Sequence, residues 1–346
     1  METVKKIVAK YGLPRVIITL FLFALFVAAP FVGVRVDESV TNTLNRFGMN
    51  CVMVLAMVPM IHSGCGLNFG LPLGIISGLL GATMAIQLEF HGLLCFLMAI
   101  VLSTPFAVIL GYGYGKLLNK VKGGEMMIAT YVGFSSVSFM CIMWLLLPYT
   151  NASMVWGYAG RGLRTTISTE GYFLHALNDH FAISLGKLVI PTGMILFFAI
   201  LAFAMWAFLH TKTGTAMTAV GSNPTFARAC GINVDRIRVL SVIMSTWLGA
   251  VGILVYEQSF GFIQLYMAPF YMALPAVSAI LIGGASVNKA SITNVIIGTL
   301  LFQGILTMTP SVMNSAIHTD MSEVIRIIVS NGMILYALTR KMEVAR

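Results

Sequence analysis

The polar side chains of this sequence form no catalytic motif and no nucleotide-binding motif. The HExxH pattern of metalloproteases and the GxSxG pattern of hydrolases are absent, and no close pair of acids is positioned with a base in a candidate cavity. Residues 111–116 read GYGYGK, but their spacing is wrong for a phosphate-binding loop, and Leu117 stands where that loop needs Ser or Thr. We therefore expect a protein that is not an enzyme and that binds no ATP itself.

The cysteines predict no metal centre. They stand singly, without CxxC spacing and without a nearby histidine cluster of the metal-ligand type. We expect buried free thiols, no metal ligands and no cofactor bound by this chain. The cysteines are Cys51, Cys65, Cys95, Cys141 and Cys230.

A few titratable groups could serve ion-coupled transport. His62 could carry a proton, and Glu89, Glu257 and Glu323 could be coupling carboxylates, but all three acids fall near the ends of apolar stretches. A charge in the middle of a bilayer costs about 2.5–3.5 kcal/mol or more, and no sustained line of buried carboxylates is present. The sequence therefore argues against an ion relay, and an ion-coupled carrier or a channel stays the alternative.

Uncharged hydrogen-bonding side chains suit the passage of a neutral hydroxylated or heterocyclic solute. Those within or near apolar stretches are Asn50, Asn68, Gln258, Gln264, Asn294 and Gln303. Each can equally join two membrane helices. The glycine-rich segment 64–70 would free backbone groups that only protein or a water-filled cavity can satisfy. We predict that the substrate pathway is lined by Asn50, Gly64, Asn68, Gly70 and Gln264.

The polar segment 213–241 predicts a short helix. Asn223 is a good N-cap, Pro224 fits the first helical position, and Gly231 is a natural left-handed terminator. The helix would be about 10 Å long, with Phe226 and Cys230 on one face. So short a helix is marginal alone in water, so we expect it to pack on the ends of the membrane helices or on another protein.

The elements that carry these residues are expected to be membrane helices. Of the 346 residues, 58% are hydrophobic and 10% are charged, against roughly a quarter charged in soluble domains. Apolar runs of about 18–25 residues match the length that crosses a bilayer. We predict an all-α integral membrane protein, one transmembrane domain over 1–346 surrounded by lipid. The roughly ten predicted spans are 16–34, 44–61, 71–88, 92–115, 125–147, 185–209, 239–256, 269–284, 289–307 and 323–339.

The distribution of basic residues predicts the topology. Lysines and arginines gather before the first span, in alternate connections and after the last span, which places both termini in the cytoplasm. The long connection 148–184 is then extracytoplasmic and 210–238 is cytoplasmic. Spans two to five and seven to ten would form inverted repeats. The net charge of +9 follows from this orientation, because the bases form no stripe of the kind that binds nucleic acid.

Three stretches together resemble a known family. The first matches a pattern of small residues, Asn and Arg followed by Gly-Ile-x-Val-x-Arg, and its residues are Gly221, Asn223, Ala227, Arg228, Gly231, Ile232, Val234 and Arg236. The others are 62–70 (HSGCGLNFG) and 279–286 (AILIGGAS). In order and spacing they resemble the membrane permeases of bacterial ATP-binding-cassette (ABC) importers that serve ribose-type monosaccharides, nucleosides and branched-chain amino acids.

The resemblance implies a role for the short helix. In that family the matching loop is a coupling helix, which docks in a groove of the ATP-hydrolysing subunit and transmits its motion. For this chain the implied coupling residues are Asn223, Pro224, Phe226, Ala227, Arg228, Gly231 and Arg236.

The resemblance also implies partners and a location. It implies cytoplasmic ABC ATPases that carry ATP and Mg, and a second permease copy or a homologous permease that encloses a central pathway. It further implies an extracytoplasmic solute-binding protein, for which 148–184 is the largest docking surface. The chain would be a multi-pass protein of the bacterial cytoplasmic (inner) membrane.

Two short stretches bear on the solute. Sugar-type members of the family carry Gly-x-Asp-Leu-Ser, whereas this chain has Gly66-Leu67-Asn68, which is closer to nucleoside-type or amino-acid-type members. Residues 124–130 (GEMMIAT) resemble the nucleoside type. We expect a small neutral solute, a monosaccharide or a nucleoside, with branched-chain amino acids as the alternative.

Overall fold

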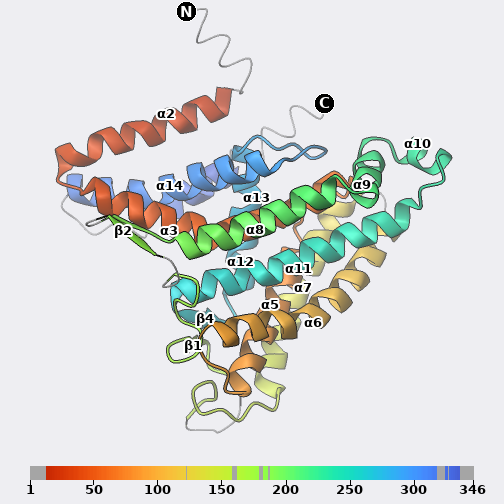
Figure 1. Ribbon diagram of the computed structural model, residues 1–346, viewed down its shortest axis with the longest axis horizontal. Helices are drawn as coiled ribbons and strands as arrows, with labels where there is room; N and C mark the ends of the chain where they lie inside the picture. The colour runs from red at the N-terminus through yellow and green to blue at the C-terminus, as the bar shows by residue number, and fades with distance from the viewer. Residues whose placement is uncertain are drawn as a thin grey trace, which may run out of the picture.

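The computed structural model describes residues 13–121, 123–157, 162–178, 182–185, 188–317, 324–325 and 327–335. The described chain is a bundle of helices with two small two-stranded sheets (Figure 1). The helices are α2 (Leu13–Ala28), η1 (Ala29–Val32), α3 (Val36–Leu55), α4 (Met57–His62), α5 (Leu71–Gln87), α6 (Gly92–Lys120), α7 (Glu125–Leu146), α8 (Thr192–Leu209), α9 (Lys212–Ser222), α10 (Pro224–Ala229), α11 (Val234–Phe260), α12 (Ala268–Tyr271), α13 (Ala273–Ile282) and α14 (Ile292–Ile317).

The strands connect segments that are distant in the sequence. Strand β1 (Thr166–Ser168) pairs antiparallel with β4 (Phe262–Gln264), so that the long connection after α7 is fastened to the end of α11. Strands β2 (Ile183–Leu185) and β3 (Leu188–Ile190) form an antiparallel hairpin before α8.

The helices agree with the predicted membrane fold. In the described part, seven helical segments are long and apolar enough to cross a membrane, and α5 and the α12–α13 segment are shorter apolar helices in the places of two further predicted spans. Residues 324–325 and 327–335 of the last predicted span are helical, and the rest of that span lies outside the described residues. The all-α membrane fold is confirmed, while the count of ten and the inverted repeats stay predictions.

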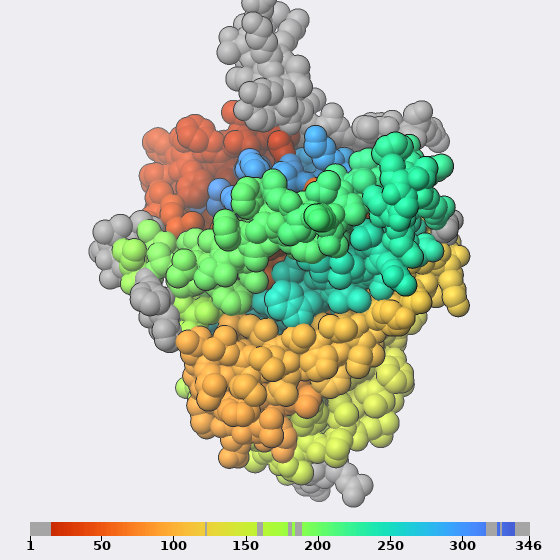
Figure 2. Space-filling view, turned by 45° about the vertical axis from the view of Figure 1, so that its right-hand side comes forward, coloured from red at the N-terminus to blue at the C-terminus, as the bar shows by residue number. Residues whose placement is uncertain are grey.

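Helix α11 forms the centre of the bundle. It packs on α3, α5 and α6, and small residues allow the close approach that membrane helices use in place of a hydrophobic driving force. A Cβ on Gly74 would lie 2.5 Å from the Thr246 carbonyl oxygen, and one on Gly252 would lie 2.9 Å from the Met53 amide nitrogen. By contrast α2, α6, α7 and α8 expose large apolar side chains, as lipid-facing helices do. Figure 2 shows α8 and the segments after it (green to teal) between α2 (red) and α6 (orange).

The connections gather at two ends of the bundle, as the predicted topology requires. One end, which we call the inner end, carries α9 and α10; there the His62 ring lies 2.8 Å from the Ala290 carbonyl oxygen. The other, the outer end, carries β1 and β4 (Figure 1). There the Gln87 side chain donates to the Thr150 hydroxyl at 2.8 Å. Tyr149 lies at the outer end, where burial raises the pKa of its hydroxyl, which remains protonated 2.9 Å from Thr83.

Two helices end alike at the inner end. Helices α4 and α13 are each followed by a glycine in the left-handed region, Gly64 (φ 72°) and Gly284 (φ 85°). In each the next amide donates to the carbonyl five residues earlier, Cys65 to Met60 at 3.0 Å and Ala285 to Ile280 at 3.1 Å, which is the Schellman arrangement. The chain therefore breaks in the same way after both helices, and the break after α4 lies against α9.

Candidate functional site

Helix α10 forms where the sequence predicts it. The Asn223 side chain accepts a hydrogen bond from the Phe226 amide at 3.0 Å, Pro224 occupies the first turn, and Gly231 follows the C-cap with φ 80°. The prediction of a short capped helix is confirmed, with six residues where seven were expected. Local capping rules determine this element, because its ends need no tertiary partner.

One face of α10 packs on its own chain and the rest is exposed. Ala227 is fully buried against Val220 of α9 and Val234 of α11, so α10 is held between these two helices. Phe226 is 63% exposed, and Arg228 is exposed beside it. An exposed aromatic side chain next to an arginine is the composition of a protein-binding surface. Cys230 and Arg236, also named from the sequence, are exposed as well.

The segments on either side of α10 both contact Gly64. A Cβ on Gly64 would lie 3.0 Å from the Gly221 Cα, and a Cβ on Gly221 would clash with the His62 carbonyl oxygen, so α9 lies directly against the break after α4. From the other side, Arg238 of α11 donates to the Gly64 carbonyl oxygen at 3.2 Å. Any displacement of α10 that carries α9 or α11 with it must therefore act on this break.

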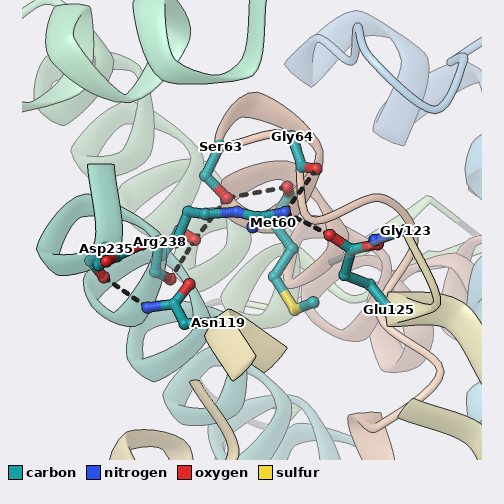
Figure 3. A network of polar contacts seen from close by, with 9 residues as sticks. Met60, Ser63, Gly64, Asn119, Gly123, Glu125, Asp235 and Arg238 are labelled. Atoms are coloured by element: carbon teal, nitrogen blue, oxygen red, sulfur yellow. Dashed lines mark hydrogen bonds and ion pairs between the residues drawn. The ribbon is translucent and has the colours of Figure 1, made fainter. Parts of the chain in front are cut away.

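A polar network surrounds the Gly64 contact (Figure 3). Arg238 also forms an ion pair with Glu125 at the start of α7, with 2.7 Å between Nη2 and Oε1. Ser241 of α11 donates to Ser63 at 2.6 Å, and Asn119 of α6 donates to the Asp235 carbonyl oxygen at 2.8 Å. The network joins the inner ends of α4, α6, α7 and α11.

Asn68 lies above the break and is completely buried. Its amide nitrogen donates to Ser245 Oγ at 2.7 Å, and its amide oxygen accepts from the Tyr114 hydroxyl at 3.4 Å. Ser245 in turn donates to the Ala56 carbonyl oxygen at 2.5 Å, where α3 gives way to α4. In this conformation Asn68 joins α6, α11 and the α3–α4 junction.

The five predicted pathway residues do not form one site. Gly64, Asn68 and Gly70 lie together, and Tyr114 fills the space that a Cβ on Gly70 would occupy. Asn50 donates to the Arg46 carbonyl oxygen of its own helix at 2.9 Å. Gln264 belongs to β4 at the outer end. The structure therefore brings three of the five together, and the role of all five in the substrate pathway stays a prediction.

A polar cavity of about 560 Å³ opens at the outer end between α3, α11 and α14. Its residues are Asn42, Asn45, Arg46, Met49, His175, Asn178, Tyr256, Ser259, Phe260, Leu306, Thr307, Pro310 and Ser311. We call it the outer cavity. The sequence analysis did not predict it. Each of the three helices nevertheless contributes a set of three lining residues at the spacing i, i+3, i+4, which places their side chains on one face of the helix. Those sets are Asn42, Asn45 and Arg46; Tyr256, Ser259 and Phe260; and Thr307, Pro310 and Ser311.

The titratable candidates of the sequence are held apart. His62 uses both ring nitrogens, with Thr218 at 3.2 Å and the Ala290 carbonyl oxygen at 2.8 Å, so it fastens α9 to the loop before α14. Glu257 is buried near the outer end of α11, and neither carboxylate oxygen has a hydrogen-bond partner there. Glu323 lies outside the described residues. Within the described residues, no group of three or more His, Cys, Asp or Glu could hold a metal ion.

Comparisons with known proteins agree on one family. A family model described as "Branched-chain amino acid transport system / permease component" matches residues 39–337. The chain is 23% identical over 296 residues to the nucleoside ABC transporter permease protein NupB of Lactococcus lactis, with 83% of this chain and 77% of that protein covered. It is 24% identical over 265 residues to the ribose import permease protein RbsC of Escherichia coli K12, with coverages of 75% and 74%.

A third relative serves another sugar. The galactofuranose transporter permease protein YtfT of Escherichia coli K12 is 23% identical over 300 residues, with 85% of this chain and 78% of that protein covered. No solved structure gives a significant match.

Proposed function

The chain belongs to the family of permease components of branched-chain amino acid transport systems. We propose that it is the membrane-spanning subunit of an ABC importer for a simple sugar or a nucleoside. ATP would be bound and hydrolysed on separate cytoplasmic ATPase subunits. An extracytoplasmic binding protein would deliver the solute, and a second permease copy or a homologous permease would complete the pathway in the bacterial inner membrane.

The observation that carries this proposal is the exposure of α10. The helix is fixed to its own chain through Ala227, yet Phe226 and Arg228 are left outside, so it offers a rigid surface to another protein. Its neighbours Gly221 and Arg238 contact the break at Gly64. A partner that moves α10 can therefore move helices inside the membrane, which is what coupling to ATP hydrolysis requires.

The chemistry of the outer cavity supports a neutral hydroxylated solute. Its described lining offers amides and hydroxyls, with Arg46 and His175 as the basic groups and no carboxylate. The ammonium group of an amino acid zwitterion would be best balanced by a carboxylate, whereas the hydroxyls of a sugar or a nucleoside bond well to uncharged amides and hydroxyls. Polar groups at this depth are tolerated where water fills the cavity, so we propose that the solute enters here.

The coupling role is tested on the reconstituted transporter, with its ATPase and binding protein, in liposomes. We expect the Phe226→Ala/Arg228→Ala variant to lose at least 90% of ATP hydrolysis stimulated by the binding protein, because the exposed part of α10 is removed. The Phe31→Ala variant is the control, since Phe31 is 87% exposed at the outer end. Unchanged uptake and hydrolysis in the α10 variant would show that the assignment is wrong, and loss of uptake on collapsing the ion gradients would favour a carrier.

A native thiol reports docking in the same complex. Cys230 is exposed at the C-cap of α10, whereas Cys51, Cys65 and Cys95 are buried. We expect the ATPase subunits to slow maleimide labelling of Cys230 at least tenfold. Equal labelling with and without the ATPase would place the docking site away from α10.

A further inference from the structure

The inner end of the molecule is closed by a small set of side chains. A cavity of about 330 Å³ lies there, lined by Gly64, Cys65, Gly66, Gly123, Gly124, Glu125, Met126, Met127 and Val287. The side chains of Met126 and Val287 approach the Gly66 backbone, where a Cβ would lie 3.3 Å and 3.4 Å from them. We call Gly66, Met126 and Val287 the inner gate. Beside it Cys65 is 2% exposed and Asn68 is fully buried, so these two side chains are shielded from the solution.

The Glu125–Arg238 ion pair lies directly beside this gate. Glu125 precedes Met126 in the first turn of α7, so the carboxylate and the gate residue move together. The pair is largely buried, with side-chain exposures of 17% for Glu125 and 11% for Arg238. The second carboxylate oxygen accepts from the Gly123 amide at 2.9 Å, so the acid is held on both sides (Figure 3).

The ion pair also connects two helices that otherwise barely meet. Helix α7 packs on α5, α6 and α12, and among the described elements its contact with α11 is slight apart from this pair. Arg238 lies one turn after Val234, the α11 residue on which Ala227 of α10 packs. Movement of α10 is therefore carried along the first turn of α11 to Arg238, while Glu125 stays with α7.

We propose that Glu125 and Arg238 form an ionic lock that holds the inner gate shut, and that displacement of α10 by the ATPase opens it by separating the two charges. This inference rests on the proposed function. When the pair separates, the Gly64 carbonyl oxygen loses the Arg238 donor, Met126 is free to leave Gly66, and the inner cavity deepens towards Cys65 and Asn68. A buried ion pair suits a two-state lock, because removing one partner leaves the other charge buried without compensation. Exchanging the two residues places opposite charges together again and removes that cost.

The test uses native Cys65, which borders the inner cavity next to Gly66 and is only 2% exposed. In the assembled transporter, carrying Cys230→Ser, the rate of maleimide labelling at Cys65 is measured by mass spectrometry. We expect Glu125→Gln and Arg238→Gln each to raise this rate at least tenfold, and the swapped variant Glu125→Arg/Arg238→Glu to return it to within threefold of the parent. Cys51, fully buried in α3, should stay unlabelled throughout and shows that the variants are folded.

The matched control breaks an ion pair of the same length elsewhere. Arg35 and Glu38 are also 2.7 Å apart, but they are exposed at the outer end, so Glu38→Gln should leave Cys65 labelling unchanged. Parental labelling of Cys65 in Glu125→Gln, with Cys51 protected, would overturn the lock. If the lock variants respond but nucleotide never changes Cys65 labelling in the parent transporter, the lock stands and coupling through α10 fails, so the two failures are distinguishable.

Discussion

Asn68 lies where three membrane helices approach one another, and both ends of its amide are used there. It donates to Ser245 of α11 and accepts from Tyr114 of α6, and it has no exposed surface. Polar side chains between membrane helices commonly have this structural role. We therefore expect Asn68 to affect transport through the packing of α6 and α11 around the break, while its contact with the solute stays a prediction.

The Asn68→Leu variant tests this role. We expect it to lower the free energy of unfolding by about 1–3 kcal/mol, because the Tyr114 hydroxyl loses a buried partner, and to reduce maximal uptake with an unchanged KM. Thermal unfolding and uptake kinetics measure the two effects. Asn50→Leu is the control, since Asn50 bonds only within its own helix turn. A raised KM with parental stability would instead indicate direct contact between Asn68 and the solute.

Helices α9, α10 and α11 act as one unit at the inner end. Helix α10 is held between its neighbours by Ala227, and these neighbours contact Gly64 from two directions. Two backbones can approach as closely as those of Gly64 and Gly221 only because both residues lack a side chain. The arrangement of α9, α10 and α11 therefore depends on the close contact between the Gly64 and Gly221 backbones as well as on the packing of Ala227.

The Gly221→Ala variant tests that close approach. Its Cβ would clash with the His62 carbonyl oxygen, which forces α9 away from α4. We expect overpacking to cost about 1–3 kcal/mol of stability and stimulated ATP hydrolysis to fall at least fivefold. Gly113→Ala in α6 is the matched control, because nothing lies within 4 Å of its Cβ position and alanine favours a helix. Parental hydrolysis in Gly221→Ala would show that the contact transmits nothing.

The molecule as a whole presents two unlike ends. The outer cavity of about 560 Å³ reaches into the bundle from one side, and the inner end holds α10 and the closed gate. Between them lie the tightly packed segments of α3 and α11, where Met53 fills the space beside Gly252. The outer cavity is the larger of the two cavities, and under the predicted topology it would face the outside of the cell, as alternating access requires of one of its two states.

Labelling from outside the cell tests both the cavity and the orientation. We expect a membrane-impermeant thiol reagent to modify the Asn45→Cys variant, because Asn45 lines the outer cavity. Val52→Cys is the matched control: it lies seven residues further along the same face of α3, is fully buried, and should stay unmodified. Native Cys230 should react only after the membrane is opened. Labelling of Cys230 in intact cells would reverse the predicted topology.

Features that depend on neighbours in the sequence were predictable. Hydropathy predicted the membrane helices of the described residues. In lipid each apolar segment must hydrogen-bond its own backbone N–H and C=O groups, so each segment forms a helix independently of its neighbours. Asn223, Pro224 and Gly231 predicted the ends of α10, because caps are local hydrogen-bonding arrangements. The glycine-rich segment after α4 was also recognised as a break, and Gly64 does adopt a left-handed conformation.

Tertiary structure alone decided which polar residues share a site. Asn50 and Gln264 lie apart from Asn68, although all three are amides in apolar surroundings. Arg238 reaches Gly64 across 174 positions of sequence, and Glu125 across 113. Such contacts follow from how whole helices pack, which no single segment encodes. The sequence by itself therefore determined the membrane helices and the short capped helix α10, while packing of the bundle determined the outer cavity, the burial of Asn68 and the Glu125–Arg238 ion pair.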